Sequence, residues 1–186
     1  MKAGLRSLKL TYEDYLHFPQ DGRRHEILDG EHFVVPAPTL RHQSVVSNLH
    51  LALGLFARTH RLGRVWTAPV DVVLSDVDIL QPDLVFVAES RGDLLAGTHV
   101  QGAPDLVVEV LSPTTRRTDL VTKRHLYEKH GVGEYWVVDP ELETVETYQL
   151  TENGYRREAP LSPQEGGALR SPLFPGLVLE LSEIFL

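Results

Sequence analysis

The sequence of 186 residues contains no cysteine. This absence excludes disulfide bonds and thiolate metal sites, and it is typical of proteins in the reducing cytoplasm, where we expect this one to reside. The chain also lacks an apolar stretch long enough to cross a bilayer, and residues 1–11 show no signal-peptide pattern. We therefore expect no membrane partner. Hydrophobic residues (42%) and charged residues (24%) occur at proportions typical of a globular protein.

Several catalytic signatures are missing as well. There is no glycine-rich phosphate loop and no Gly-x-Ser-x-Gly motif, so kinase and α/β-hydrolase chemistry lack a starting residue. The nine histidines include no His-x-His or His-x-x-x-His pair, which leaves a zinc hydrolase without support. The formal net charge of −8 argues against a protein that coats nucleic acid with a basic face. A nuclease remains compatible with this charge because bound metal ions neutralise local acidic groups.

Hydrophobic periodicity and turn signals predict an α/β fold in a single domain over residues 1–186, with residues 1–9 as an N-terminal extension. The order of elements indicates a mixed β-sheet flanked by helices, with an additional β-meander. The expected elements are a short helix from Thr11, an Asp-Gly hairpin at 25–35, a helix over 40–61, strands near 65–74, 79–88 and 104–111, a helix over 117–130, and the meander at 135–159.

Two carboxylates lie in strongly apolar surroundings. Glu109 interrupts the run Leu106–Leu111, and Asp83 directly precedes Leu84–Val87. A buried carboxylate carries a large desolvation cost unless it is paired or binds a metal. If the two strands are neighbours, the carboxylates converge, and their hard oxygen donors suit Mg²⁺ or Mn²⁺. Two alternatives stay open: Asp83 in a strand-entry turn, and Glu109 paired with an arginine.

Lys123 lies on the predicted helix that follows Glu109. A lysine near a metal site can orient a water molecule or stabilise charge that develops on a phosphate. Asp119 lies four residues before Lys123 and Tyr127 four residues after it, on one helix face. A surface salt bridge between Asp119 and Lys123 is therefore the alternative interpretation.

Basic side chains cluster immediately after the Glu109 strand. At a helix start beside a metal site, Arg116, Arg117, Lys123 and Arg124 could hold backbone phosphates, and a solvated charged face is the alternative. His42 follows Arg41 at the start of the long helix, where it could contact a phosphate or cap the turn.

The pattern Pro82-Asp83, Glu109-Val110-Leu111 and Lys123 resembles the PD-(D/E)XK, or restriction-endonuclease-like, superfamily. Within it, the chain resembles a bacterial branch of uncharacterised endonucleases, a domain of unknown function. The resemblance covers most of the chain, through the segments HEILDGE at 25–31, Arg41-His42, PDLVVEVLSP at 104–113, the residues Asp119, Lys123 and Tyr127, and the run at 131–140.

The resemblance implies an α/β core and carries the metal-ligand role onto Asp83 and Glu109. In the parent motif the lysine follows the second acid by two residues, a position that Leu111 occupies here. The resemblance therefore implies that Lys123 replaces it from the following helix. Superfamily members often add an early glutamate to the metal shell, a role we carry onto Glu26, with Glu31 as its rival on the paired strand.

These observations predict an endonuclease that depends on Mg²⁺ or Mn²⁺ and hydrolyses DNA phosphodiester bonds by metal-activated water. Asp83 and Glu109 would be the ligands, and Lys123 would orient the water or stabilise charge. Because such nucleases often pair to cut two strands, we expect a homodimer. Two other functions stay open. The acidic charge and the missing strand lysine favour a catalytically inactive binding or assembly module, and the acidic surface would also suit a phosphoesterase of small nucleotides.

Overall fold

The structure, a computed structural model, describes residues 8–186, so the N-terminal extension expected over residues 1–9 lies outside the described residues except for its last two. A six-stranded mixed sheet forms the centre, in the order β11-β10-β9-β8-β6-β3. Its strands are β3 (Gly63–Thr67), β6 (Leu84–Ala88), β8 (Leu106–Val110), β9 (Glu134–Asp139), β10 (Thr144–Thr151) and β11 (Gly154–Arg157). β8 and β9 run parallel, whereas the other neighbours are antiparallel.

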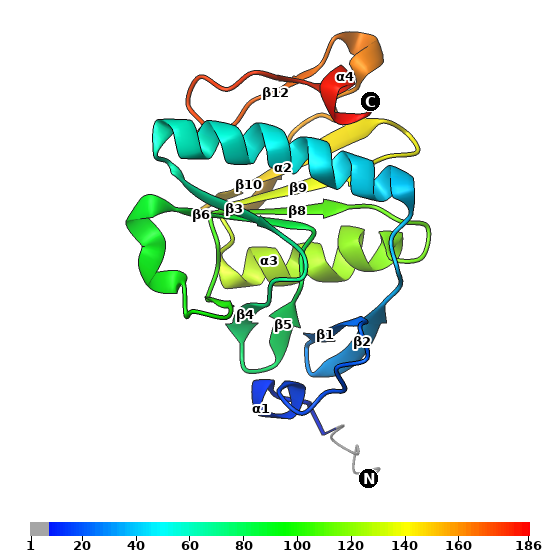
Figure 1. Ribbon diagram of the computed structural model, residues 1–186, viewed down its shortest axis with the longest axis vertical. Helices are drawn as coiled ribbons and strands as arrows, with labels where there is room; N and C mark the ends of the chain where they lie inside the picture. The colour runs from blue at the N-terminus through cyan, green and yellow to red at the C-terminus, as the bar shows by residue number, and fades with distance from the viewer. Residues whose placement is uncertain (1–7) are drawn as a thin grey trace.

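Helices cover both faces of this sheet (Figure 1). α2 (Leu40–His60) packs on one face, and the segment made of η2 (Thr118–Lys123) and α3 (Arg124–His130) packs on the other. The alternation of side chains along β8 explains the two cores: Val108 faces α2, and Val107 faces α3. The last elements are β12 (Ala168–Leu169), β13 (Leu179–Glu180) and α4 (Leu181–Ile184). They pack beside α2 (Figure 1), and Phe174 between them contacts Phe86 and Trp136 of the sheet.

A second sheet of five strands, in the order β2-β1-β5-β4-β7, lies at the other end of the molecule with α1 (Tyr12–Tyr15) against it (Figure 1). Its strands are β1 (Arg24–Leu28), β2 (Glu31–Val35), β4 (Val72–Ser75), β5 (Asp78–Leu80) and β7 (Val100–Gln101). The two remaining short helices are η1 (Glu89–Leu94) and η3 (Pro163–Glu165). The mixed α/β architecture expected from the sequence, including the meander β9–β11, is confirmed.

Two of the expected strands are each divided in two. The strand predicted over 65–74 is broken at Ala68-Pro69 into β3 and β4, and the strand predicted over 79–88 is broken at Gln81-Pro82 into β5 and β6. Proline has no N–H for the hydrogen-bond ladder, so both strands leave their partners at these points. In each case the first and second halves join different sheets. Asp83 therefore lies where the chain passes between the two sheets.

None of the helices between residues 8 and 186 combines the length and the apolar character required to cross a membrane.

Candidate functional site

The site lies where β6 and β8 pair beside the passage between the two sheets. Leu84 of β6 is opposite Val108 of β8 in an antiparallel register. Extending this register by one residue places Asp83 opposite Glu109. The structure therefore brings together the two carboxylates that the sequence singled out, and both side chains are buried.

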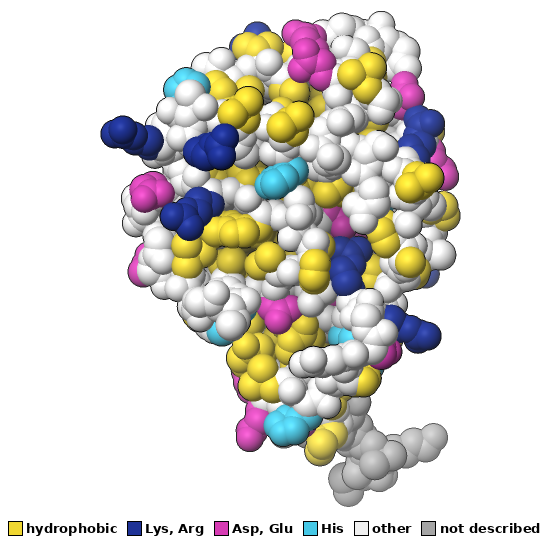
Figure 2. Space-filling view, in the orientation of Figure 1, with side chains coloured by type: hydrophobic (Ala, Val, Ile, Leu, Met, Phe, Trp, Pro, Cys, Tyr) yellow, Lys and Arg dark blue, Asp and Glu magenta, His cyan; other side chains and the backbone are white. Residues whose placement is uncertain are grey.

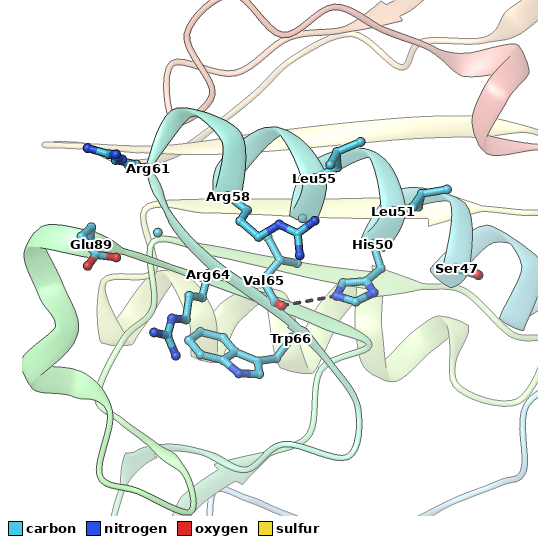
Figure 3. Close-up of a pocket in the computed structure, with 12 residues that line it drawn as sticks. Ser47, His50, Leu51, Leu55, Arg58, Arg61, Arg64, Val65, Trp66 and Glu89 are labelled. Carbon is cyan, nitrogen blue, oxygen red and sulfur yellow. Dashed lines mark hydrogen bonds between the residues drawn. The ribbon is translucent and has the colours of Figure 1, made fainter.

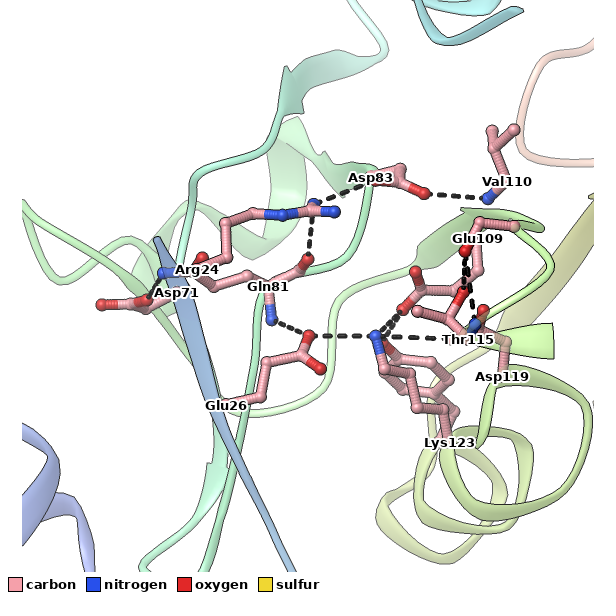
Figure 4. Close-up of polar contacts among 12 residues, drawn as sticks. Arg24, Glu26, Asp71, Gln81, Asp83, Glu109, Val110, Thr115, Asp119 and Lys123 are labelled. Carbon is pink, nitrogen blue, oxygen red and sulfur yellow. Dashed lines mark hydrogen bonds and ion pairs between the residues drawn. The ribbon is translucent and has the colours of Figure 1, made fainter. Parts of the chain in front are cut away.

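Lys123 is the cation at the centre of the cluster (Figure 4). Its Nζ lies 2.9 Å from Glu26 Oε1, 3.0 Å from Glu109 Oε1 and 3.6 Å from Asp119 Oδ1. Only 4% of Lys123 is exposed. The surface salt bridge to Asp119 is therefore the wrong interpretation, because the lysine is buried and lies closer to the other two carboxylates.

The local helix geometry explains how Lys123 reaches this position. Residues Thr118–Lys123 form a π-helical turn ahead of α3, and both Asp119 and Lys123 are buried within it. Such turns are rare and recur at functional sites. The lysine is thus supplied by a widened helical turn, while the position it would hold in the parent motif, Leu111, belongs to the hydrophobic core.

Two further hydrogen bonds hold the carboxylates that contact Lys123. The Tyr127 hydroxyl donates to Glu109 Oε1 at 2.7 Å, and Glu26 Oε1 accepts the Gln81 N–H at 2.8 Å. Glu26 is buried, whereas Glu31 on the paired strand is exposed. Of the two early glutamates, the structure brings only Glu26 to the cluster, and there it contacts Lys123.

Asp83 is held by three donors. Arg24 Nη1 donates to Oδ1 at 3.0 Å, while Oδ2 accepts the Val110 N–H at 2.9 Å and lies 3.1 Å from His42 Nε2. Arg24 was not predicted from the sequence as a site residue, although it precedes Glu26 by two residues on β1 and so shares its side of the strand. His42 contacts Asp83, and its buried Nδ1 has no partner among the described residues.

The surroundings shift the pKa values of Glu109 and Asp83 in opposite directions. Burial raises the pKa of Glu109 to about 8, an effect that Lys123 opposes and the neighbouring acids strengthen. Burial also acts to raise the pKa of Asp83, but His42, Arg24 and the Val110 N–H outweigh it and hold that pKa below its usual value. Two carboxylates with divergent protonation in one place are a feature of functional sites.

Lys123 and Tyr127 keep the protonation states that are usual for these side chains at neutral pH. Burial acts to lower the pKa of Lys123, yet the charges of Glu109, Glu26 and Asp119 outweigh it and keep that pKa well above its usual value. Burial and the charge of Glu109 raise the pKa of Tyr127. Lys123 is therefore an ammonium ion and Tyr127 a neutral hydroxyl across the physiological range.

The cluster opens on a pocket of about 210 Å³. Asp83, Glu109, Asp119 and Lys123 line it together with the segments 36–39 and 112–115.

The phosphate-contact candidates on the following helix lie elsewhere. Arg116 Nη1 is 2.6 Å from Asp139 Oδ2, and the Arg124 guanidinium lies over the Tyr148 ring, 5.7 Å from its centroid. Arg117 is exposed, and none of these three arginines lines the pocket.

The chemistry of the cluster suits a hard divalent cation. Asp119 Oδ1 is buried with no hydrogen-bond donor, and the bonds to Glu109 within residues 8–186 all end on Oε1, which leaves Oε2 available. Carboxylate oxygens are the ligands that Mg²⁺ prefers. The described residues nevertheless contain no preformed group of three acidic or histidine side chains around a metal position. A cation at Asp83 would therefore compete with Arg24 and His42.

The central mixed sheet flanked by helices, with two acids at adjacent strand ends and a lysine beside them, defines a protein of the restriction-endonuclease-like class. The chain belongs to the Uma2 family, described as "Putative restriction endonuclease", whose sequence model matches residues 12–182. It is also similar to the crystal structure of a putative nuclease belonging to DUF820 from Anabaena variabilis ATCC 29413. The TM-score is 0.80 at 21% identity, covering 95% of this chain and 97% of the other.

Among proteins of curated function, none matches the chain significantly. The family and the fold class expected from the sequence are confirmed by these comparisons.

Proposed function

We propose that this protein is a divalent-metal-dependent endonuclease that hydrolyses DNA phosphodiester bonds at the pocket of Asp83, Glu109 and Lys123. The observation that carries the proposal is the convergence of three carboxylates on one buried lysine, with Asp83 lining the same pocket. Buried ion pairs contribute little net stability compared with apolar residues of the same volume. A cluster of this size at the end of two core strands is therefore better explained by function.

Asp83 and Glu109 are the proposed ligands of Mg²⁺ or Mn²⁺. When bound, such an ion offsets charge on the scissile phosphate and lowers the pKa of water. Tyr127 holds Glu109 through Oε1, and the Val110 N–H holds Asp83 through Oδ2, so both carboxylates are oriented before substrate arrives. Orientation in advance reduces the reorganisation that the reaction requires.

Lys123 is proposed to stabilise negative charge on the substrate phosphate. Its raised pKa makes it a permanent ammonium ion and excludes it as a general base at neutral pH. Glu26 and Asp119 position this ammonium beside Glu109. Charge fixed at the place where it is needed is among the largest contributions to enzymatic catalysis.

A binding or assembly module without catalysis is the second candidate. One observation favours it: Asp83 already has three donors, and Lys123 already bridges Glu109 and Glu26. In this reading the lysine serves as the internal cation that a metal would otherwise provide.

Two further parts of the proposal are the homodimer and the cytoplasmic location. The pairing of similar nucleases to cut two strands supports the first, and a sequence without cysteine supports the second. Gel filtration with light scattering tests the homodimer, for which we expect twice the chain mass of 20.9 kDa.

Cleavage of supercoiled plasmid and of single-stranded DNA by the purified protein tests the proposed activity. We expect nicking that requires Mn²⁺ or Mg²⁺ and falls by at least about 100-fold in Asp83→Asn and Glu109→Gln. Asp93→Asn removes an exposed acid outside the pocket and should cleave like the wild type. Cleavage of a dinucleotide but not of DNA would indicate a small-nucleotide phosphoesterase. No cleavage of either substrate would favour the binding module.

A further inference from the structure

A second hollow, of about 840 Å³, lies between α2 and the edge strand β3 (Figure 3). Arg58 and Arg61 border it from the C-terminal end of α2, and Arg64 and Trp66 border it from β3. His50 closes the space between the two elements, with its Nε2 3.3 Å from the Val65 carbonyl oxygen. Neither the family comparison nor the acid cluster accounts for this surface.

The charge of the hollow is opposite to that of the whole chain. Arg58, Arg61 and Arg64 are exposed, and within residues 8–186 none of them forms an ion pair. A single acid, Glu89, lines the hollow, whereas the chain carries a formal net charge of −8. Figure 2 shows Lys and Arg side chains gathered over this end of α2. An uncompensated positive surface in an acidic protein is complementary to phosphate groups.

The hollow also offers an aromatic and apolar wall. Trp66 of β3 is partly exposed, and Leu51 and Leu55 of α2 are exposed at 69% and 54%. Figure 2 shows hydrophobic side chains between the basic ones on this face. Proteins that bind single strands combine a positive groove with aromatic side chains on which bases stack.

Another hollow follows along α2 on the side of the acid cluster, with Val46 and Thr67 next to Ser47 and Trp66 of the first. Val46 and Gln43, one and two turns along the same side of α2 from His50, line an intermediate hollow of about 270 Å³ together with Thr67 and Asp83. This intermediate hollow and the pocket of Asp83 and Glu109 share Arg24, Asp83 and the segment 35–38. One side of α2 therefore borders a path from the arginines to Asp83. From His42 to Arg61 the helix rises about 28 Å, a length that spans several nucleotides.

We propose that this α2–β3 groove binds a single strand of nucleic acid and directs it to the pocket of Asp83 and Glu109. The phosphates contact Arg58, Arg61 and Arg64, and an unpaired base stacks on Trp66. A duplex is disfavoured because its bases are stacked on each other and cannot reach a ring that lies between a helix and an edge strand. Delivery of the nucleic acid to Asp83 and Glu109 rests on the proposed function, whereas binding of the nucleic acid in the groove does not.

Tryptophan fluorescence in the presence of EDTA tests the groove without catalysis. The chain has two tryptophans, of which Trp136 lies in β9 within the core and is 1% exposed, so quenching by a stacked base reports Trp66. Titration with an oligothymidylate of about twelve nucleotides should quench the emission. Trp66→Phe should abolish the quenching, and Trp66→Ala, which removes the stacking ring, should weaken binding about 10-fold, as measured by the anisotropy of a labelled strand.

Salt dependence tests the arginines. For single strands, the slope of log K against log salt concentration changes by about 0.7 for each phosphate contact. Arg58→Gln, Arg61→Gln and Arg64→Gln should each reduce the slope by about 0.7. The matched control is Arg170→Gln, which removes the charge of an exposed arginine outside the groove and should leave the slope unchanged.

Several results would overturn the proposal. They are unchanged binding in the Trp66 and arginine variants, equal weakening by Arg170→Gln, and a duplex that binds as tightly as the single strand. Dissociation of a dimer by the arginine variants, without any effect on strand binding, would instead assign the groove to a second copy of the chain. Strand binding in the groove without cleavage would refute the proposed nuclease and leave the groove intact. Cleavage of single strands that ignores the groove variants would refute only the groove.

Discussion

Substitution of Lys123 by methionine removes the cation that Glu26, Glu109 and Asp119 share while keeping most of the buried volume. At 2.9 and 3.0 Å, each of the two short contacts is worth roughly 6 kcal/mol of gross attraction at an effective dielectric constant of about 20. Desolvation of the charged groups offsets most of this. Removing one partner of a buried ion pair costs about 3–5 kcal/mol, because the opposite charge stays buried without compensation.

That loss is a large part of the stability of a domain, which is about 5–15 kcal/mol in total. For a chain of 186 residues, we expect Lys123→Met to lower the melting temperature by on the order of 10 °C. The acids that lose their cation will take up protons more readily. The destabilisation should therefore be smaller at acidic pH than at pH 8, which urea unfolding at a series of pH values measures.

Lys129→Met is the matched control, since Lys129 lies on the next helix with a side chain that is 46% exposed and 3.3 Å from Asp78. Asp78 is buried, but it also accepts the Asp29 N–H and the Ser75 hydroxyl, so removing the half-exposed Lys129 should cost less than removing the buried Lys123. If Lys123→Met were as mild as Lys129→Met, or if its effect were the same at every pH, the lysine would not be the charge centre of the cluster.

Three other predictions concern stability. The folded pKa of Glu109, about 8, lies above its ordinary value of 4.5, so its contribution to stability is fully present below about pH 4.5 and is lost as the pH rises through 8. Glu109→Gln imitates the protonated acid, so the free energy of unfolding should depend less on pH across this window in urea titrations. Gly63 has φ +148°, and a Cβ there would lie 2.2 Å from a carbonyl oxygen of β6, so Gly63→Ala should cost about 3 kcal/mol or more. Gly54→Ala, at an uncrowded position within α2, should instead raise the melting temperature through a gain of about 1 kcal/mol.

The local elements were the most predictable part of the fold. Asp29 and Gly30 form the turn between β1 and β2 with φ of 52° and 81°, values that an Asp-Gly pair adopts readily, and the helix over 40–61 followed from its apolar spacing. The breaks at Pro69 and Pro82 were missed, although proline within a strand signals such a break. Continuous apolar character on both sides concealed them, because each half is buried in a different sheet.

The candidate site was predictable in its acids but less so in its cations. Glu109 and Asp83 were visible because a carboxylate is conspicuous among aliphatic residues. Arg24 was not, because its partnership with Asp83 spans 59 residues and depends on how the two sheets join. The burial of Lys123 could not be read either, since helical spacing does not reveal a π-helical turn.

The groove was concealed in a different way. Arg58, Arg61 and Arg64 lie on a helix end and the following strand, and in sequence two other residues separate each arginine from the next. The basic group predicted from the sequence was Arg116, Arg117, Lys123 and Arg124, of which only Lys123 lines the pocket. Only the antiparallel return of β3 beneath α2 brings the three groove arginines to one surface.

The most direct test of the proposed metal centre is the binding of Mn²⁺ measured by electron paramagnetic resonance, which reports the free ion. We predict saturable binding that is lost in Asp83→Asn and in Glu109→Gln and retained in Asp93→Asn. Saturable binding in all four proteins, or in none of them, would contradict the assignment of Asp83 and Glu109 as ligands of a divalent metal.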